Sequence, residues 1–281
     1  MKSDSRSARP QPPYSPQALF QLGARVALVT GATGHLGEYI TRALAAAGAH
    51  VIIVARSRSV VSDLAEDLKR EGLQATAIAC DVTKEAKLKR LVRSIEARFG
   101  SLDIIVNNAY GGSPGTISDA TARDFSDAYR ISVEAAFRLV QLAHPLLIQG
   151  VSVKQGGASV INIASMYASV SPDPKVYGES GENNPPYYGA AKAGLVQLTR
   201  YLACHFAPER IRVNSISPGP FPADVSSESG RKFVNKLKSK VPLGRIGHPA
   251  ELAGAVIFLA SDASSYVTGV NIPVDGGWTA W

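Results

Sequence analysis

The stretch Val26–Gly37, which reads VALVTGATGHLG, decides the fold. Its first part, Val26–Thr30, is a short unbroken apolar run of the kind that forms buried strands, and an amphipathic helical pattern follows from Leu36 to Ala47. The small residues between the two allow the backbone to turn tightly. The sequence therefore predicts a strand, a glycine-rich turn and a helix in direct succession.

The same alternation continues to the end of the chain. Further apolar runs predict strands over Val51–Ala55, Ala75–Ala79, Ile104–Val106, Ser159–Ile163, Ile211–Ile216 and Val270–Val274. Helical patterns separate them over Val60–Arg70, Glu85–Phe99, Asp124–Gln149, Tyr187–Phe206 and Ala250–Ala260. Strands that are apolar throughout need cover on both faces, and helical crossovers make neighbouring strands parallel. We expect an α/β fold, a single-domain, Rossmann-type, doubly wound parallel sheet of about seven strands.

The composition argues against several other classes of protein. Of the 281 residues 45% are hydrophobic, and no span of about 18 apolar residues suggests a membrane crossing. The net charge of +7 is scattered without interleaved aromatic residues, so no nucleic-acid partner is expected. The two cysteines, Cys80 and Cys204, are too few for a disulfide framework or a four-thiolate metal site. We expect both to pack as small apolar groups in a reducing, cytoplasmic compartment.

Residues 1–18 are expected to be a disordered tail, because prolines stand there among Ser, Gln and Arg with few apolar residues. Basic residues occur near the N-terminus, but no apolar stretch follows them, so no secretory signal is expected. No Pro-, Gly- or Ser-rich linker divides the rest. Residues 19–281 should therefore form one domain.

The glycine-rich turn is suited to holding a dinucleotide. Free N–H groups and the positive end of a helix would reach a pyrophosphate there. The residues concerned are Gly31, Thr33, Gly34, His35, Leu36 and Gly37. A turn that serves only the fold is the alternative, and the strand–turn–helix context argues against it.

Polar residues follow the next two predicted strands. Arg56 and Ser57 come after the second strand, and no Asp or Glu stands at positions 54–57. An arginine there suits the 2′-phosphate of NADP, so NADP(H) is favoured, with NAD(H) as the alternative. The alternative to binding the 2′-phosphate is that Arg56 only solvates the start of a helix. Asp81, after the third strand, can accept a hydrogen bond from adenine or cap the following helix.

Tyr188 and Lys192 are four residues apart in a helical segment and so share one face. A nearby ammonium favours the phenolate, so Lys192 is expected to lower the pKa of Tyr188. Such a tyrosine exchanges a proton with a carbinol oxygen while hydride moves to or from a nicotinamide. Ser165 ends the fifth predicted strand, where its hydroxyl can hold the substrate oxygen or merely cap the strand end.

Taken in order, these motifs resemble those of the short-chain dehydrogenase/reductase family over Leu19–Trp278. They are the Thr30–Gly37 turn, Asp81-Val82, Asn107-Asn108-Ala109, Ser165, Tyr188-x-x-x-Lys192, Ser217-Pro218-Gly219 and Val274-Asp275-Gly276-Gly277. The resemblance implies that Ser165 polarises a carbonyl, Tyr188 is the general acid/base and Lys192 anchors the nicotinamide ribose. It further implies a cofactor contact by Asp81, Val82, Asn108, Ala109, Pro218, Gly219 and Phe221.

Three positions depart from the usual pattern of this branch of the family. His35 stands where the second glycine is common, with Gly34 one place early, as in sugar-nucleotide-modifying members. Ser132 stands where an Asn often holds a proton-relay water, and its hydroxyl can also bind water. Tyr110 replaces a glycine after Ala109, which predicts a bulky ring near the nicotinamide.

Two segments bear on the substrate. The long stretch 171–186 between Ser165 and Tyr188 is expected to form a wall of the substrate pocket, or else a surface or subunit-contact loop. The segment 228–240, where the family places its lid, carries five basic residues against one acidic residue. A small anionic carbonyl or alcohol substrate would suit it, and a solvated helix face is the alternative.

Leu19-Phe20-x-Leu22 and the segment Tyr188–Tyr201 resemble gluconate 5-dehydrogenase-type members, which favours a keto sugar acid. A 3-oxoacyl thioester reductase is the second interpretation. An NADP(H)-sensing regulator without turnover and an epimerase or dehydratase with bound NAD are others. Family members usually form homotetramers, so a homotetramer or homodimer is expected, and the aromatic residues Trp278 and Trp281 fit a subunit contact.

Overall fold

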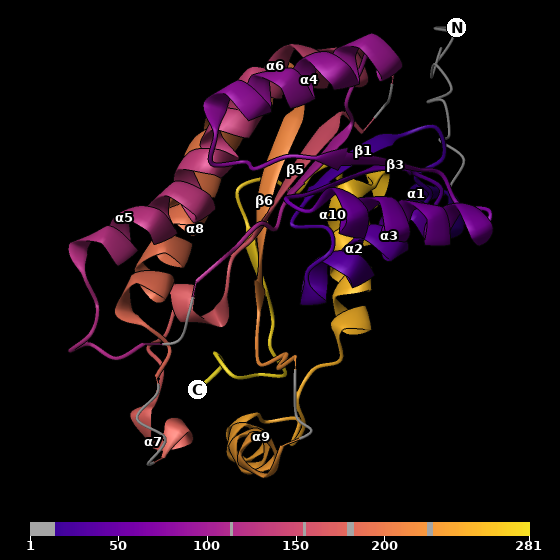
Figure 1. Cartoon of the computed structure of the whole chain (residues 1–281). Helices are drawn as coiled ribbons and strands as arrows, with labels where there is room; N and C mark the ends of the chain where they lie inside the picture. The colour runs from indigo at the N-terminus through magenta and orange to yellow at the C-terminus, as the bar shows by residue number, and fades with distance from the viewer. Residues whose placement is uncertain (1–14, 113–114, 154–155, 179–182, 224–226) are drawn as a thin grey trace, which may run out of the picture.

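The computed structural model describes residues 15–112, 115–153, 156–178, 183–223 and 227–281. Seven parallel strands form one sheet in the order β3-β2-β1-β4-β5-β6-β7 (Figure 1). The strands are β1 (Val26–Thr30), β2 (His50–Ala55), β3 (Ala75–Ala79), β4 (Ile104–Asn107), β5 (Ala158–Ile163), β6 (Ile211–Pro218) and β7 (Asn271–Val274). The expected doubly wound α/β fold is confirmed, and every predicted strand is present.

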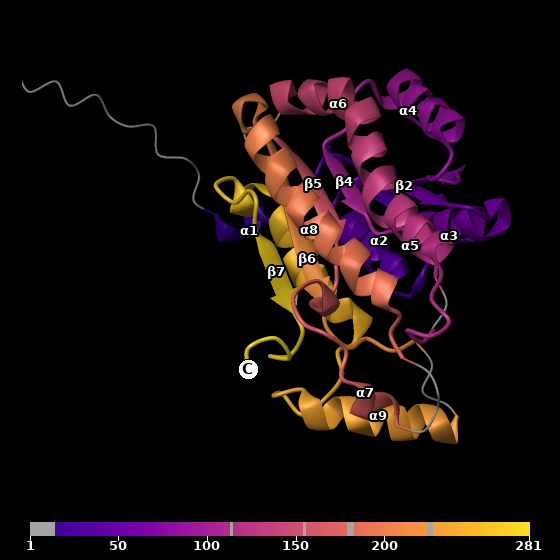
Figure 2. The ribbon, with the colours of Figure 1, turned by 90° about the vertical axis from the view of Figure 1, so that its left-hand side faces the viewer.

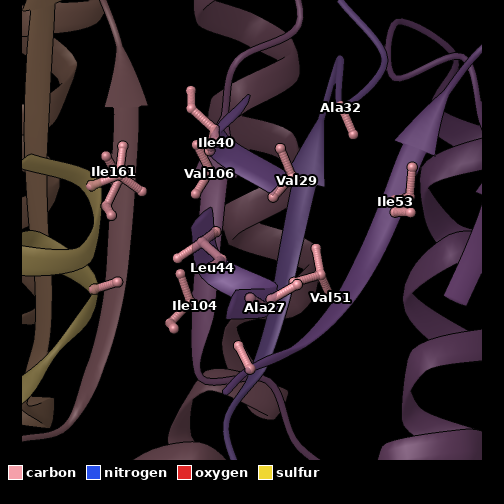
Figure 3. Packing of buried hydrophobic residues seen from close by; sticks show 14 of the residues in the cluster. Ala27, Val29, Ala32, Ile40, Leu44, Val51, Ile53, Ile104, Val106 and Ile161 are labelled. Carbon is pink, nitrogen blue, oxygen red and sulfur yellow. The ribbon is translucent and has the colours of Figure 1, made fainter. Parts of the chain in front are cut away.

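Helices cover both faces of the sheet (Figures 1 and 2). On one face lie α2 (His35–Ala46), α3 (Arg58–Arg70) and α10 (Ala253–Ala260), and on the other α4 (Glu85–Phe99), α6 (Ala135–Val153) and α8 (Pro186–Phe206). Successive side chains of a strand point to opposite faces, so Ala27 and Val29 join the first core and Leu28 the second. Figure 3 shows the first core, where Ile40 and Leu44 of α2 meet the strands.

The order of the strands reverses between β1 and β4. Chain segments leave these neighbouring strands in opposite directions, and that leaves a crevice beyond their carboxyl ends. The loops that follow β1, β2, β3, β4, β5 and β6 all begin at this same edge. The topology alone therefore brings together the segments from which candidate site residues were drawn.

The predicted long helix over Asp124–Gln149 is divided. It consists of α5 (Ala122–Tyr129), the π-helical turn η1 (Arg130–Glu134) and α6. A window within Ala122–Val151 is apolar enough, by length and composition, to cross a membrane. Half of that window is buried inside the protein, where α6 packs on α4 and the sheet. This apolar run is therefore explained by the core that it covers.

Other differences from the predicted elements are local. The segment 228–240 forms the 13-residue helix α9 (Glu228–Lys240), and α7 (Pro174–Tyr177) interrupts the predicted loop over 171–186. At the N-terminal end, α1 (Pro16–Leu19) is capped by Ser15, so the structured part begins before residue 19. The expected tail over residues 1–14 lies outside the described residues. Short 3-10 turns, η2 (Met166–Ala168), η3 (Ala207–Glu209), η4 (Pro249–Leu252) and η5 (Asp262–Ser264), complete the elements.

Candidate active site

A groove of about 560 Å³ runs along the carboxyl edge of the sheet. Its lining includes every residue that the sequence proposed for the cofactor, together with Ser165, Tyr188 and Lys192. The cofactor candidates are Gly31, Thr33, Gly34, His35, Leu36, Gly37, Arg56, Ser57, Asp81, Val82, Asn108, Ala109, Pro218, Gly219 and Phe221. Residues from six strand ends and from α8 thus meet in one place, although they are spread over nearly 200 positions of the chain.

The glycine turn forms one end of this groove. Gly31 has a φ of +63°, which side chains disfavour, and a Cβ on Gly37 would lie 2.0 Å from the carbonyl oxygen of Gly31. Gly34 is the N-cap of α2 and supplies no side-chain cap. The first N–H groups of α2 are therefore open to an anion in the groove. His35 begins the helix one residue later, so the altered spacing still ends in a cradle that fits a pyrophosphate.

Hydrogen bonds of Thr30 and Asn108 connect this turn to the loop after β4, the neighbouring strand in the sheet. The backbone N–H groups of Asn108 and Ala109 donate to Thr30 Oγ1 at 3.1 and 3.2 Å. Asn108 Nδ2 donates to the Gly31 carbonyl at 2.9 Å. These bonds hold the loops after β1 and β4 together. Asn108 thus has a structural function in shaping the groove that it also lines.

Arg56 and Ser57 lie at the end of β2, where Ser57 is the N-cap of α3. Asp81 Oδ1 accepts hydrogen bonds from the N–H and the hydroxyl of Thr83 at 3.0 and 2.7 Å. Burial opposes ionisation of Asp81, but these bonds, with Lys87 and Lys84 nearby, bring its pKa below the ordinary value. The N-cap of α4 is Lys84, so Asp81 does not cap the helix and its anion faces the groove.

Ser165 and Tyr188 are the candidate catalytic pair of the groove. The Ser165 side chain lies near enough to the Tyr188 hydroxyl to act on its pKa, and both residues line the groove. Ser165 Oγ also accepts from the Tyr167 N–H at 3.2 Å and caps η2, which follows the strand end, whereas its hold on a substrate oxygen stays a prediction. Burial raises the pKa of Tyr188, against which Ser165 acts only in part. The expected lowering of this pKa is therefore wrong for the protein alone: burial raises it, and Lys192 is not among the groups that act on it.

Lys192 lies one helical turn beyond Tyr188 and is 3% exposed. Its Nζ donates to the carbonyl oxygen of Ile163 at 2.7 Å, and burial lowers its pKa to about 8. The Nζ atom is 5.8 Å from the ring centre of Tyr188 and 5.4 Å from that of Tyr110. The amine is thus held by the Ile163 carbonyl and lies near the rings of Tyr110 and Tyr188.

Ser132 lies behind the groove on the π-helical turn η1. It is 3% exposed, and its Oγ has no hydrogen-bond partner among the described residues. A cavity of about 10 Å³ adjoins it, lined also by Thr30, Asn107 and Lys192. That volume is close to the space one water molecule needs. An unpaired buried hydroxyl and a polar cavity beside Lys192 fit a single bound water.

The structure adds residues that the motifs did not single out. Cys80, Ile131, Ile163 and Ala164 also line the groove, and burial raises the pKa of the Cys80 thiol to about 11. Nothing in their residue types signalled this, since each reads as ordinary core. Cys204 is exposed on α8, so the expectation that both cysteines pack internally is wrong for it. Within the described residues no group of His, Cys, Asp and Glu could hold a metal ion.

The segments expected to form the substrate side lie below the sheet edge in Figure 2, where α7 and α9 are adjacent. Tyr177 of α7 meets Phe233 of α9 with ring centres 5.5 Å apart, and Asp173 pairs with Lys240. Residues 179–182 of the proposed pocket wall lie outside the described residues. Trp278 packs into this cluster of the same chain, whereas Trp281 is exposed, and the expected subunit contact of the two stays a prediction.

The charges of α9 point away from its packed face. Val234 and Leu237 are buried, and Phe233 is half-buried, whereas Lys232 and Lys236 are exposed. Lys232 pairs with Glu228, and Lys240 pairs with Asp173. The helix therefore turns an apolar face towards the body of the protein and a solvated basic face outwards.

A parallel sheet with a glycine cradle at its switch point, and a Ser–Tyr–Lys cluster beside it, defines a dinucleotide-binding oxidoreductase. A family model described as Enoyl-(Acyl carrier protein) reductase matches residues 31–279. A tropinone reductase homolog of Arabidopsis thaliana is 36% identical over 261 residues, which cover 92% of this chain and 91% of that protein. The chain belongs to the short-chain dehydrogenase/reductase family.

Solved structures agree with this assignment. A short-chain type dehydrogenase/reductase from Mycobacterium marinum matches with a TM-score of 0.83 at 33% identity, covering 95% of this chain and 100% of that one. A gluconate 5-dehydrogenase from Burkholderia cenocepacia J2315, in complex with NADP and tartrate, matches with a TM-score of 0.83 at 29% identity and the same coverage. The fold and the oxidoreductase class are therefore shared over almost the whole chain.

Proposed function

We propose that this protein interconverts a secondary alcohol and a ketone with NADP(H), using Tyr188 as general acid/base. The observation that carries the proposal is the position of Ser165, Tyr188 and Lys192 in the same groove as the glycine cradle of α2. A regulator that only senses nucleotide would have no need of Ser165 and Tyr188 together in this groove beside a buried lysine.

The bound dinucleotide would supply or accept the hydride at its nicotinamide ring. Ser165 would donate a hydrogen bond to the carbonyl oxygen of the substrate and orient it next to the phenol. Tyr188 would give its hydroxyl proton to that oxygen as negative charge develops on it. Ser132 and a water in the adjoining cavity would return a proton by way of Lys192, since Ser132 and Lys192 both line that cavity.

The raised pKa of Tyr188 predicts how the rates of ketone reduction and alcohol oxidation change with pH. A phenol that keeps its proton at neutral pH is ready to act as an acid, so ketone reduction should be near its maximum there. Alcohol oxidation needs the phenolate and should accelerate as the pH rises. Opposite slopes of the two initial rates between pH 7 and 10 are the expected result.

NADP(H) is proposed over NAD(H) because Arg56 lines the groove at the end of β2 and no acidic residue stands at positions 54–57. The likeness to a gluconate 5-dehydrogenase with bound NADP supports the same choice. Arg56 would pair with the 2′-phosphate, and Asp81 would accept from the adenine amino group.

For the substrate we propose a keto sugar acid, supported by that same structural likeness. The apolar inner face of α9 favours the second candidate, a ketone with an apolar body such as a 3-oxoacyl thioester. We further propose a cytoplasmic homotetramer or homodimer, supported by exposed apolar side chains such as Tyr201, Tyr266 and Trp281. Light scattering of the purified protein tests the assembly.

A screen of NADPH oxidation over keto sugar acids, 3-oxoacyl thioesters, simple ketones and quinones tests the function. The substrate found should be turned over at least about 1,000-fold more slowly by Tyr188→Phe, while NADPH still binds. Full activity of Tyr188→Phe would disprove the mechanism. Binding of NADPH with no turnover of any ketone would instead favour the sensing protein.

A further inference from the structure

We propose that Tyr110 is a positioning residue for this reaction: its ring covers the Lys192 ammonium and braces the ring of Tyr188. The catalytic consequence rests on the proposed function, but the contact itself does not. Tyr110 follows β4, whereas Tyr188 and Lys192 are on α8, so the contact joins the two sides of the groove.

The three groups form a compact arrangement. The ring centres of Tyr110 and Tyr188 are 4.9 Å apart at an interplanar angle of 76°, an edge-to-face contact. Lys192 Nζ lies 5.4 Å from the centre of the Tyr110 ring and 5.8 Å from that of Tyr188. Both distances are within the range in which an ammonium is attracted by an aromatic ring.

Lys192 has little else to stabilise its charge. Its ammonium donates to the carbonyl of Ile163 at the end of β5. It also lies near the ring of Tyr188 on its own helix and near the ring of Tyr110 in the loop after β4. The uncharged Thr30, Asn107 and Ser132 complete the adjoining cavity. No carboxylate acts on its pKa, which burial alone lowers to about 8. An aromatic ring is therefore a substantial part of what keeps this amine protonated.

Tyr110 is also suited to remain neutral. Burial raises its pKa, so the ring presents the attractive face of a phenol rather than a second charge that would compete for the proton of Tyr188. Its hydroxyl end lies against Gly112, where an added Cβ would come within 2.4 Å of the Tyr110 oxygen. The absence of a side chain at Gly112 thus leaves the space in which the Tyr110 ring lies.

The test compares Tyr110→Leu with Tyr110→Phe. Leucine removes the ring and phenylalanine keeps it. Only leucine should therefore remove the attraction of the ring for the Lys192 ammonium, so that burial lowers the pKa of Lys192 further. The pKa of Lys192 is measured by NMR on protein labelled with ¹³C at the lysine Cε, without substrate, and its signal is assigned as the one lost in Lys192→Met. We expect Tyr110→Leu to lower this pKa by about one unit and Tyr110→Phe by less than about 0.3 units.

Gly112→Ala is the second variant, for the case that Tyr110→Leu does not fold. It leaves Tyr110 in the chain but displaces its ring, and should lower the pKa of Lys192 in the same direction. An unchanged pKa in the folded ring-removing variant overturns the proposal, as does an equal fall in Tyr110→Phe, which would assign the effect to the hydroxyl.

The pH profile of kcat/KM supplies the catalytic readout. If charged Lys192 is needed, the falling limb of ketone reduction should move to lower pH by the same interval in Tyr110→Leu and not in Tyr110→Phe. A limb that stays in place while the NMR pKa moves would reject the catalytic consequence and leave the contact. If no substrate is found, the NMR titration still decides whether Tyr110 sustains the charge.

Discussion

The glycine turn of the groove, here the cofactor side, and the α7–α9 cluster, here the lid side, are built in different ways. On the cofactor side, the turn Gly31–Gly37 and the loop at Asn108 are held by backbone contacts and by residues too small to separate them. On the lid side, α7 and α9 are held by packing between large side chains such as Tyr177 and Phe233. Backbone contacts tolerate almost no change, whereas an apolar face can adapt. We therefore expect sharp losses on the first side and graded ones on the second.

The largest effect should come from Gly37→Ala. The new Cβ would lie 2.0 Å from a backbone oxygen, so the turn must open, and no flexible side chain can give way. We expect at least a 100-fold loss of NADPH affinity and a fall of about 3 kcal/mol in the free energy of unfolding. Fluorescence titration with NADPH and urea unfolding measure the two quantities.

Gly254→Ala is the matched control, since nothing lies within 4 Å of the added Cβ on α10. It should leave NADPH affinity unchanged and not lower stability, because Ala favours a helix over Gly. If the two variants behave alike, the close approach of Gly37 to Gly31 is not what shapes the cradle.

Arg56→Asp should have the next largest effect, confined to the choice of cofactor. Loss of the guanidinium removes a partner for the 2′-phosphate, and the new carboxylate repels it. The ratio of kcat/KM for NADPH to that for NADH should fall by about 100-fold. Arg58→Asp makes the same charge change on α3 outside the groove, and an equal fall there would show a general field effect instead.

On the lid side, Phe233→Ala should raise the KM of the substrate by about tenfold, because apolar area next to Tyr177 is lost. NADPH affinity should stay within about twofold, since Phe233 is not part of the cofactor groove. Lys232→Ala, at an exposed and paired position, is the control and should leave the KM unchanged. If Lys236→Ala raises the KM and Phe233→Ala does not, the lid recognises an anion.

The contrast also explains what the sequence could predict. Strands such as Ala75–Ala79 and the helix Glu85–Phe99 were predicted to the residue, because local periodicity carries that information. All cofactor candidates meet in one groove, because parallel strands place their carboxyl ends at one edge. The π-helical turn at Ser132 was not predicted, since its extra residue per turn leaves no mark in the apolar pattern.

The lid side was harder to predict for a physical reason. The count of lysines on α9 suggested an anionic substrate, but charge counts do not say which face of a helix is packed. The pKa of Tyr188 was predicted in the wrong direction for a similar reason. The spacing to Lys192 was visible in the sequence, whereas the burial that raises the pKa of Tyr188 depends on distant segments.

The smallest effect is expected for Asp173→Asn, which breaks the ion pair with Lys240 between the loop before α7 and the end of α9. The hydrogen bond from Lys240 holds the pKa of Asp173 below its ordinary value, so the pair is fully present above that ordinary value and is lost as pH falls through the lowered one. Both partners are partly exposed, and solvent screens such pairs. We expect the KM to change by less than about threefold at pH 7, and 0.5 M NaCl to abolish the difference. A double-mutant cycle with Lys240→Met isolates the pair. A larger change that persists in salt would mean that the lid, like the cofactor side, depends on one fixed contact.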